Sequence, residues 1–398
     1  MNRADYDVVV IGGGISGLMA SLHLVQQGLK TALISRGDPI CCLSTGCIDV
    51  YAGTRKPLKG LKGLPKEHPY NIVGEGGIKD ALEFFIDIMD KTGLPYEGTT
   101  KKNRQILTPV GTYKTTCLVP GTMSHASPEN DEYIHVISFK GIKDFYPSYI
   151  TSKLKNTGYS VFDAHAVSTM AIASKFEEEA FLQEFISWLQ DLFIPHGRVA
   201  IPAVLGISNP LDVIEKIKAA IDREVFEIPT LPPSIPGIRL YKTLKSTLLK
   251  KGGHLYWGRP ISSVESQGGQ VEAVTIQTSG RPTRVHGRSF ILATGSFVSG
   301  GIYATRDSVK EMVFDLPVYV PGPRDDWFNP DFFDTGHAIE TAGILTDQSF
   351  KAIESDYDNL FVCGSILAYC QIMKNHCGHG LAISTGVAAA EKCEEYLS

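Results

Sequence analysis

The hydrophobic pattern at the start of the chain predicts a complete strand–helix–strand unit. Residues 7–11 form an apolar run, residues 12–17 are rich in glycine, and residues 18–27 repeat apolar positions at helical spacing until Gly28. A second apolar run follows at residues 31–34. Short apolar runs bounded by glycine are typical of buried strands, and a period near 3.6 residues is typical of a helix. The pattern therefore predicts two parallel strands joined by a helix.

The middle of the chain alternates again between strand-like and helix-like segments. One of the helices carries Phe181, Phe185, Trp188, Leu189 and Leu192 on a single face, which predicts packing in a core. The predicted strands cover residues 133–139, 159–162, 199–203 and 225–228, and the predicted helices cover 144–156, 181–193 and 211–221. This alternation predicts a second α/β layer.

Proline and glycine mark the connections between these layers. Residues 51–66 predict a loop that leaves the first layer. Residues 229–240 contain too many prolines for a helix interior or a central strand, so they predict a crossing between domains. A helix over 240–250 and strands up to residue 291 follow, and residues 271–277 alternate apolar and polar side chains as a half-exposed strand does.

Composition and charge exclude several function classes. Of the 398 residues 43% are hydrophobic and 20% are charged, which is typical of an ordered globular protein. The net charge of −5, without a basic block, argues against a nucleic-acid partner. The chain enters a strand at once and has no apolar stretch of the ~20 residues that span a bilayer, so we expect a cytoplasmic protein that meets a membrane only through partners.

The cysteines do not predict a metal centre. The chain has Cys41, Cys42, Cys47, Cys117, Cys363, Cys370, Cys377 and Cys393. None of them forms a CxxC pair, and the spacing of the first three matches neither a ferredoxin run nor a zinc knuckle. We therefore expect buried free thiols and no metal.

The glycine-rich turn predicts a dinucleotide site. It has the spacing GxGxxG, in which Gly12 permits the tight turn, Gly14 admits a pyrophosphate and Gly17 lets helix and strand approach. The whole turn, with Gly13, Ile15 and Ser16, leads into a helix N-terminus that offers free N–H groups.

The end of the second strand departs from the usual dinucleotide pattern. The acidic residue that holds an adenosine ribose is replaced by Ser35, and Arg36 follows it. A serine can still bond a hydroxyl group, and an arginine can contact a phosphate. These residues therefore do not decide whether the cofactor contains an adenosine group.

Two later motifs favour a flavin over a nicotinamide. An apolar strand ends in Ala293, Thr294 and Gly295, where small residues let the chain turn beside a cofactor. A further strand ends at Gly364 and Ser365, and Gly380 and Leu381 lie in the first turn of the last helix. The N-terminus of that helix would stabilise the negative charge of a reduced flavin.

Several motifs together resemble the B subunits of the anaerobic glycerol-3-phosphate dehydrogenases over essentially the whole chain. They are residues 12–17, LSTGCID at 43–49, TPVGT at 108–112, TLPPSIPGIRL at 230–240 and ATGSFVSGG at 293–301. The resemblance implies a flavoprotein, described in that family as using FMN, with a larger FAD-containing subunit and an iron–sulfur, membrane-attached subunit as partners. We add Ser44, Thr45 and Gly46 to the expected flavin contacts.

Oxidation of an alcohol would need a base near the flavin and a cation for the acidic group of the substrate. His376 and His379 are candidate bases, and Arg239 and Arg36 are candidate anion contacts. The alternative to a role in catalysis is that the histidines cap a turn and that the arginines are surface or structural residues.

The sequence as a whole predicts an α/β fold with a Rossmann-like flavin-binding domain at residues 1–66 and 229–398 and an inserted α/β domain at 67–228. The leading function is a flavoprotein subunit of a quinone-linked glycerol-3-phosphate dehydrogenase, with FAD or FMN held non-covalently. A dehydrogenase for another small hydroxy or amino acid and a non-catalytic flavin-binding scaffold subunit are the alternatives.

Overall fold

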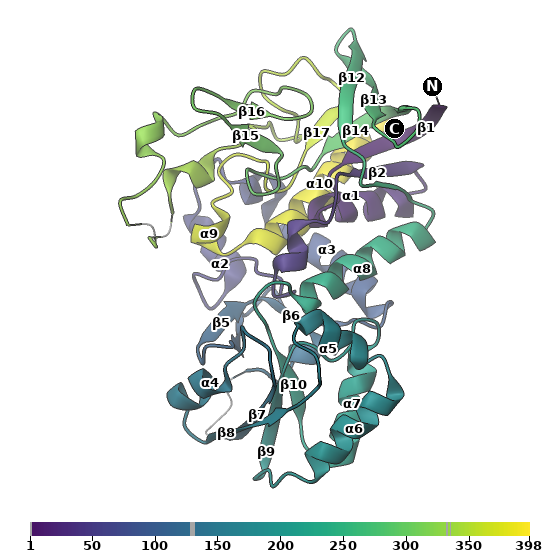
Figure 1. Cartoon of the computed structure of the whole chain (residues 1–398). Coiled ribbons are helices and arrows are strands. Elements are labelled where there is room, and N and C mark those ends of the chain that lie inside the picture. The colour runs from purple at the N-terminus through teal and green to yellow at the C-terminus, as the bar shows by residue number, and fades with distance from the viewer. Residues whose placement is uncertain (1, 128–131, 332, 335) are drawn as a thin grey trace. The chain divides into compact units, whose positions relative to one another are not determined.

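The computed structural model describes residues 2–127, 132–331, 333–334 and 336–398, which form two compact units (Figure 1). Unit 1 contains Met1–Ile40, Leu58–Ile88 and Leu244–Ser398, and unit 2 contains Cys41–Pro57 and Met89–Thr243. The α/β fold class is confirmed in both units. Each unit is described by itself below.

The units differ from the predicted domain bounds because tertiary contacts cross the expected boundaries. His68, just before α3 (Pro69–Asp90), bonds the Cys370 carbonyl, and Phe84 on α3 packs against His23. These contacts place the start of α3 in unit 1. The second crossing falls inside α8 (Ile235–Lys250), since unit 1 resumes at residue 244.

Unit 1 is built on a seven-stranded sheet with the order β11-β2-β1-β14-β13-β12 and with β17 beside β14. The parallel strands are β1 (Asn2–Ile11), β2 (Thr31–Ser35), β11 (His254–Trp257), β14 (Thr283–Leu292) and β17 (Leu360–Val362), and the antiparallel ones are β12 (Ile261–Gln267) and β13 (Gln270–Ile276). The predicted strand–helix–strand unit is confirmed as β1, α1 (Ile15–Gln26) and β2.

The first helix of the chain, α1, packs against the last one, α10 (Gly378–Leu397), in unit 1 (Figure 1). Smaller elements complete the unit. They are α2 (Pro57–Gly60), α9 (Ile372–Asn375), the 3-10 turns η2 (Leu61–Gly63), η4 (Arg324–Asp326) and η5 (Ala338–Thr341), and the hairpin β15 (Ile302–Ala304) with β16 (Val309–Glu311). The 3-10 turn η1 (Ile40–Leu43) begins at the last residue of this segment of unit 1 and continues into unit 2.

Unit 2 contains a parallel four-stranded sheet with the order β10-β9-β7-β8. Its strands are β7 (Tyr133–Phe139), β8 (Thr157–Phe162), β9 (Gly197–Pro202) and β10 (Val225–Ile228), and its helices are α4 (Pro147–Lys153), α5 (Thr169–Lys175), α6 (Glu179–Gln190), α7 (Pro210–Ile221) and the start of α8. Two small hairpins pair β3 (Tyr96–Gly98) with β6 (Leu118–Pro120) and β4 (Arg104–Leu107) with β5 (Tyr113–Thr116), and the turn η3 (Gly121–Met123) follows β6.

The aromatic face of α6 packs in the core of unit 2, as predicted. The Phe185 ring lies 5.2 Å from the ring of Phe162 on β8 and 5.7 Å from that of Phe139 on β7, measured between centroids. Phe185 is fully buried, so this helix is fixed by the burial of its apolar stripe.

Two local predictions are wrong. Residues 229–240 were expected to precede a helix over 240–250, but α8 begins at Ile235. Pro236 permits this start because it lies at the second helical position, where no intrahelical N–H is needed. Residues 271–277 were expected to be half exposed, but β13 is mostly buried, because side chains on both faces of this strand are covered and only Glu272 is exposed within it.

Candidate flavin site

The glycine turn after β1 has the geometry that a dinucleotide needs. Gly12 has φ +120°, and a β-carbon there would lie 2.2 Å from the Ala293 carbonyl oxygen. A β-carbon on Gly17 would lie 1.9 Å from the Gly12 oxygen, so only glycine lets α1 approach the strand. A β-carbon on Gly14 would meet nothing within 4 Å. The space above Gly14 is therefore open on the side where a pyrophosphate would approach.

The three predicted flavin motifs meet at one edge of the unit 1 sheet. Ile11 ends β1 beside Leu292 of β14, which in turn lies beside Val362 of β17. The strands are parallel, so the loops that follow them leave from the same edge. The structure thus brings together the glycine turn, the loop at Ala293, Thr294 and Gly295, and the loop at Gly364 and Ser365.

Close contacts hold these loops to one another. A β-carbon on Gly364, which has φ +83°, would lie 2.3 Å from Ser16 Oγ, and one on Gly295 would lie 3.2 Å from Ser365 Oγ. Thr294 Oγ1 is buried and has no hydrogen-bond partner within the described part of the chain. A hydroxyl group of this kind beside an open glycine turn fits a polar cofactor that completes its hydrogen bonding.

Ser35 and Arg36 lie at the end of β2, close to this edge. Ser35 is buried, and its hydroxyl donates to the Gly37 oxygen at 2.7 Å while its Oγ packs under Gly13. Arg36 is exposed and donates from Nη2 to the Ser299 oxygen at 3.4 Å. Ser35 therefore supports the turn, and Arg36 follows β2 directly.

The start of α10 is tied to the same edge. The Gly364 N–H donates to Thr385 Oγ1 at 3.0 Å, and Gly380 and Leu381 are buried in the first turns of the helix. His379 is half buried there, whereas His376 is exposed, with φ +43°, just before the helix. A helix N-terminus carries a partial positive charge, which suits a reduced flavin. The roles of both histidines as bases stay predictions.

Ser44, Thr45 and Gly46 lie in unit 2, in the loop that precedes the Ile48 bridge. Ser44 Oγ donates to the Cys41 oxygen at 2.7 Å, and the Gly46 oxygen accepts from the Tyr96 hydroxyl at 2.7 Å. A β-carbon on Gly46 would lie 2.8 Å from Pro236 Cβ. The loop is thus fixed against the start of α8, and its contact with a flavin stays a prediction.

Arg239 is held in a buried ion pair, which differs from the expected anion contact. Its guanidinium donates to both Glu227 carboxylate oxygens, at 2.6 and 2.9 Å, and to the Gly206 oxygen at 2.6 Å from Nη2 and 2.8 Å from Nε. Arg239 is 2% exposed and Glu227 is fully buried. The N–H groups that would bind a substrate anion are therefore already used inside unit 2.

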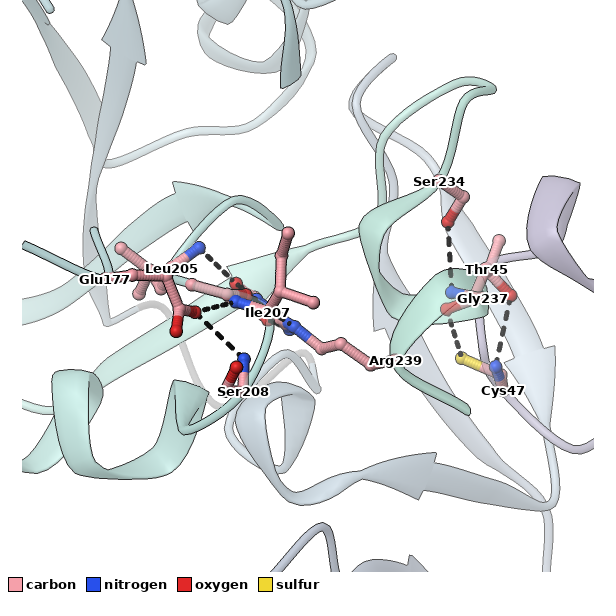
Figure 2. Close-up of polar contacts among 11 residues, drawn as sticks. Thr45, Cys47, Glu177, Leu205, Ile207, Ser208, Ser234, Gly237 and Arg239 are labelled. Carbon is pink, nitrogen blue, oxygen red and sulfur yellow. Dashed lines mark hydrogen bonds and ion pairs between the residues drawn. The ribbon is translucent and has the colours of Figure 1, made fainter. Parts of the chain in front are cut away.

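Two glutamates hold the backbone of the loop after β9, and Figure 2 shows the contacts of one of them, Glu177. Glu227 also accepts from the Leu205 N–H at 2.9 Å, and Glu177 accepts from the Ser208 N–H at 2.9 Å and from the Ile207 N–H. The geometry therefore indicates that Arg239 stabilises this loop, since it also bonds the Gly206 oxygen.

The cysteines are free, and all are buried except Cys42, which is half buried. Desolvation by burial raises the pKa of Cys47 to about 11 and the pKa of Cys363 to about 12. Protonated thiols are poor nucleophiles and poor metal ligands. Among the described residues no cluster of His, Cys, Asp and Glu could hold a metal ion, and no helix is long and apolar enough to cross a membrane.

Sequence reasoning missed the buried His68, which ties α3 to the loop after β17. Its Nδ1 accepts from the Tyr70 N–H at 3.2 Å and its Nε2 donates to the Cys370 oxygen at 3.2 Å, so the ring is neutral. Desolvation lowers the pKa of His68 to about 4. No local signal reveals this histidine, because its partner lies some three hundred residues away.

Comparison with known proteins agrees with the geometry. The model of the FAD binding domain family matches residues 7–381. The anaerobic glycerol-3-phosphate dehydrogenase B subunit of Aliivibrio fischeri is 30% identical over 99% of this chain and 96% of that protein. A probable B subunit of the same kind from Halobacterium salinarum is 28% identical over 99% of both chains. Among solved structures, 3-ketosteroid delta1-dehydrogenase from Sterolibacterium denitrificans covers 98% of this chain and 100% of that chain, with TM-score 0.48 and 11% identity.

Proposed function

Because the chain belongs to the FAD binding domain family and to the family of anaerobic glycerol-3-phosphate dehydrogenase B subunits, and is thus a flavin-dependent dehydrogenase subunit, we propose its specific reaction. It oxidises sn-glycerol 3-phosphate to dihydroxyacetone phosphate and passes the electrons through its flavin to an iron–sulfur partner and then to quinone. The observation that supports this most strongly is the match to these B subunits over nearly the full length of both chains.

The residues of unit 1 fit a flavin dinucleotide. The open space over Gly14, the unpartnered Thr294 hydroxyl and the N-terminus of α10 lie around one edge of the sheet. The pyrophosphate would bind the N-terminus of α1, as in other dinucleotide sites. When bound, the flavin supplies the acceptor for the two electrons of an alcohol oxidation.

We propose FAD over FMN, held non-covalently. FMN has a single phosphate, whereas the turn at Gly12, Gly14 and Gly17 is built for a pyrophosphate. The test is acid precipitation of the yellow protein followed by mass spectrometry of the supernatant. FAD in the supernatant is the expected result; FMN, or colour that stays with the pellet, contradicts this cofactor assignment.

The partners we propose are a larger FAD-containing subunit and an iron–sulfur subunit attached to the cytoplasmic membrane. None of the described residues forms a cluster site, and no described helix spans a bilayer, so this chain needs a partner to deliver electrons to quinone. The test compares quinone reduction by the isolated chain and by the reconstituted complex, with glycerol 3-phosphate as donor. Equal turnover in the two preparations contradicts the proposal.

The isolated chain and the reconstituted complex also distinguish the two alternative functions. A dehydrogenase for another small hydroxy or amino acid would have its flavin reduced by that acid and not by glycerol 3-phosphate. A scaffold subunit would leave its flavin oxidised with every donor, although the complex would turn over.

A further inference from the structure

Two tyrosines form a stacked pair in unit 1. The ring centroids of Tyr319 and Tyr369 lie 4.9 Å apart with an angle of 25° between the planes. Both residues are half buried, so the pair is neither in the core nor on an open surface.

The backbone around the pair is closely built. Tyr319 exchanges two hydrogen bonds with Gly343, at 2.8 and 3.1 Å, and the Tyr369 N–H donates to the Thr341 oxygen at 2.9 Å. A β-carbon on Gly343 would lie 2.5 Å from the Leu367 carbonyl carbon. The glycine therefore lets three segments pack side by side, and this packing brings the two rings into contact.

One member of the pair, Tyr369, lies on the loop that follows β17 at the flavin edge of the sheet. Tyr369 follows Gly364, whose N–H donates to Thr385 on α10, and a β-carbon on Gly364 would lie 2.3 Å from Ser16 Oγ at the start of α1. The same loop ends at the N-terminus of α10. Tyr369 thus lies in the segment that joins β17 to α10.

The backbone of this loop is strained at three residues. Tyr369, Gln371 and His376 have φ values of +61°, +41° and +43°, which side chains other than glycine rarely adopt. Such conformations persist where the surroundings force them, and they cluster at binding and catalytic sites. In the same loop Asn375 is 7% exposed, and its Nδ2 has no hydrogen-bond partner within the described part of the chain.

We propose that the hydroxyl groups of Tyr319 and Tyr369 bind the oxygen of the substrate carbon that the flavin oxidises. The proposal rests on the proposed function in one respect, namely that unit 1 holds a flavin that oxidises an alcohol. An alcohol donates a hydrogen bond and its ketone product only accepts, and a phenol group can serve both because it donates and accepts. The pair therefore binds substrate and product oxygens in one place.

The protonation of the pair fits binding better than proton removal. The neighbouring Tyr319 hydroxyl group, followed by desolvation through burial, raises the pKa of Tyr369 to about 12. The phenol stays protonated at neutral pH and can donate to a ketone oxygen. The proton of the alcohol must then pass to another base.

The experiment uses the full-length chain purified with its flavin and its partner subunits. Tyr319→Phe and Tyr369→Phe each remove one hydroxyl group and keep the ring stack. Tyr396→Phe is the matched control, because the Tyr396 hydroxyl bonds Gln270 near the end of α10. We expect kcat/KM for glycerol 3-phosphate, and the affinity for dihydroxyacetone phosphate seen as a flavin difference spectrum, to fall about tenfold or more in the two test variants.

The controls separate the possible failures. Flavin content and reduction by dithionite should equal those of the wild type in all three variants. Wild-type kcat/KM and affinity in both test variants overturn the proposal, as does a lower melting temperature with unchanged kcat/KM. Wild-type protein without flavin overturns the proposed function itself. Bound flavin that glycerol 3-phosphate does not reduce and dihydroxyacetone phosphate does not perturb overturns the role of the pair toward this substrate.

Discussion

Gly386 on α10 faces the backbone of Ser16 on α1 so closely that a β-carbon on Gly386 would lie 2.5 Å from the Ser16 oxygen. The first helix and the last helix of unit 1 therefore meet without a side chain between them. Because Ser16 belongs to the glycine turn, this contact links the C-terminal helix to the pyrophosphate end of the candidate site.

Replacement of Gly386 by Val should weaken this contact. The added atoms have no space, and overpacking of this kind costs roughly 1–3 kcal/mol. Ala388→Val is the control, since Ala388 is half buried on the same helix. Urea unfolding should show a lower midpoint for Gly386→Val alone; equal midpoints would mean that the helices can separate at no cost.

Replacement of Gly14 by Val should remove the flavin and leave the fold. The new side chain enters empty space and Gly14 has φ −73°, so the flavin-free protein should melt near the wild-type temperature. The same atoms would occupy the volume that the phosphate needs. Gly63→Val, which also enters open space, should stay yellow. Full flavin stoichiometry in Gly14→Val would contradict the site.

Removal of one partner of the Arg239–Glu227 pair should destabilise unit 2 severely. Arg239→Met leaves a buried carboxylate without its cation, and such losses cost about 3–5 kcal/mol. The double variant Arg239→Met with Glu227→Leu removes both charges and should regain a large part of this energy. Denaturant unfolding of the two variants and the wild type measures the coupling. A folded, fully stable Arg239→Met with lost substrate affinity would instead restore the anion-binding role.

The stability of unit 1 should fall in acid because of His68. Its folded-state pKa of about 4 lies below the ordinary value of about 6.5, so the unfolded state binds a proton first as the pH falls. Neutral His68 contributes its full share to the free energy of unfolding above about pH 6.5. This share, on the order of 3 kcal/mol, is lost progressively as the pH falls from about 6.5 to 4. His68→Gln should flatten the dependence of unfolding free energy on pH in this window, whereas His196→Gln, at an exposed site, should not. The same slope in both variants would assign the effect to other groups.

Local pattern determined the first strand–helix–strand unit, the helix α6 and the cofactor turn. The spacing of Gly12, Gly14 and Gly17 between a strand and a helix depends on backbone conformation over a few residues, which the sequence encodes directly. The stripe with Phe185 fixed the buried face of α6 in the same way, because helical periodicity is a local property.

The partners of side chains were decided only by the tertiary structure. Arg239 was expected to bind an anion because the sequence could not show that β10 would bring Glu227 beside it. Tyr319 and Tyr369 meet through Gly343, and His68 meets Cys370, only after distant segments pack around the sheet. Burial then sets their protonation, since desolvation depends on the whole surroundings of a group and not on its neighbours in the chain.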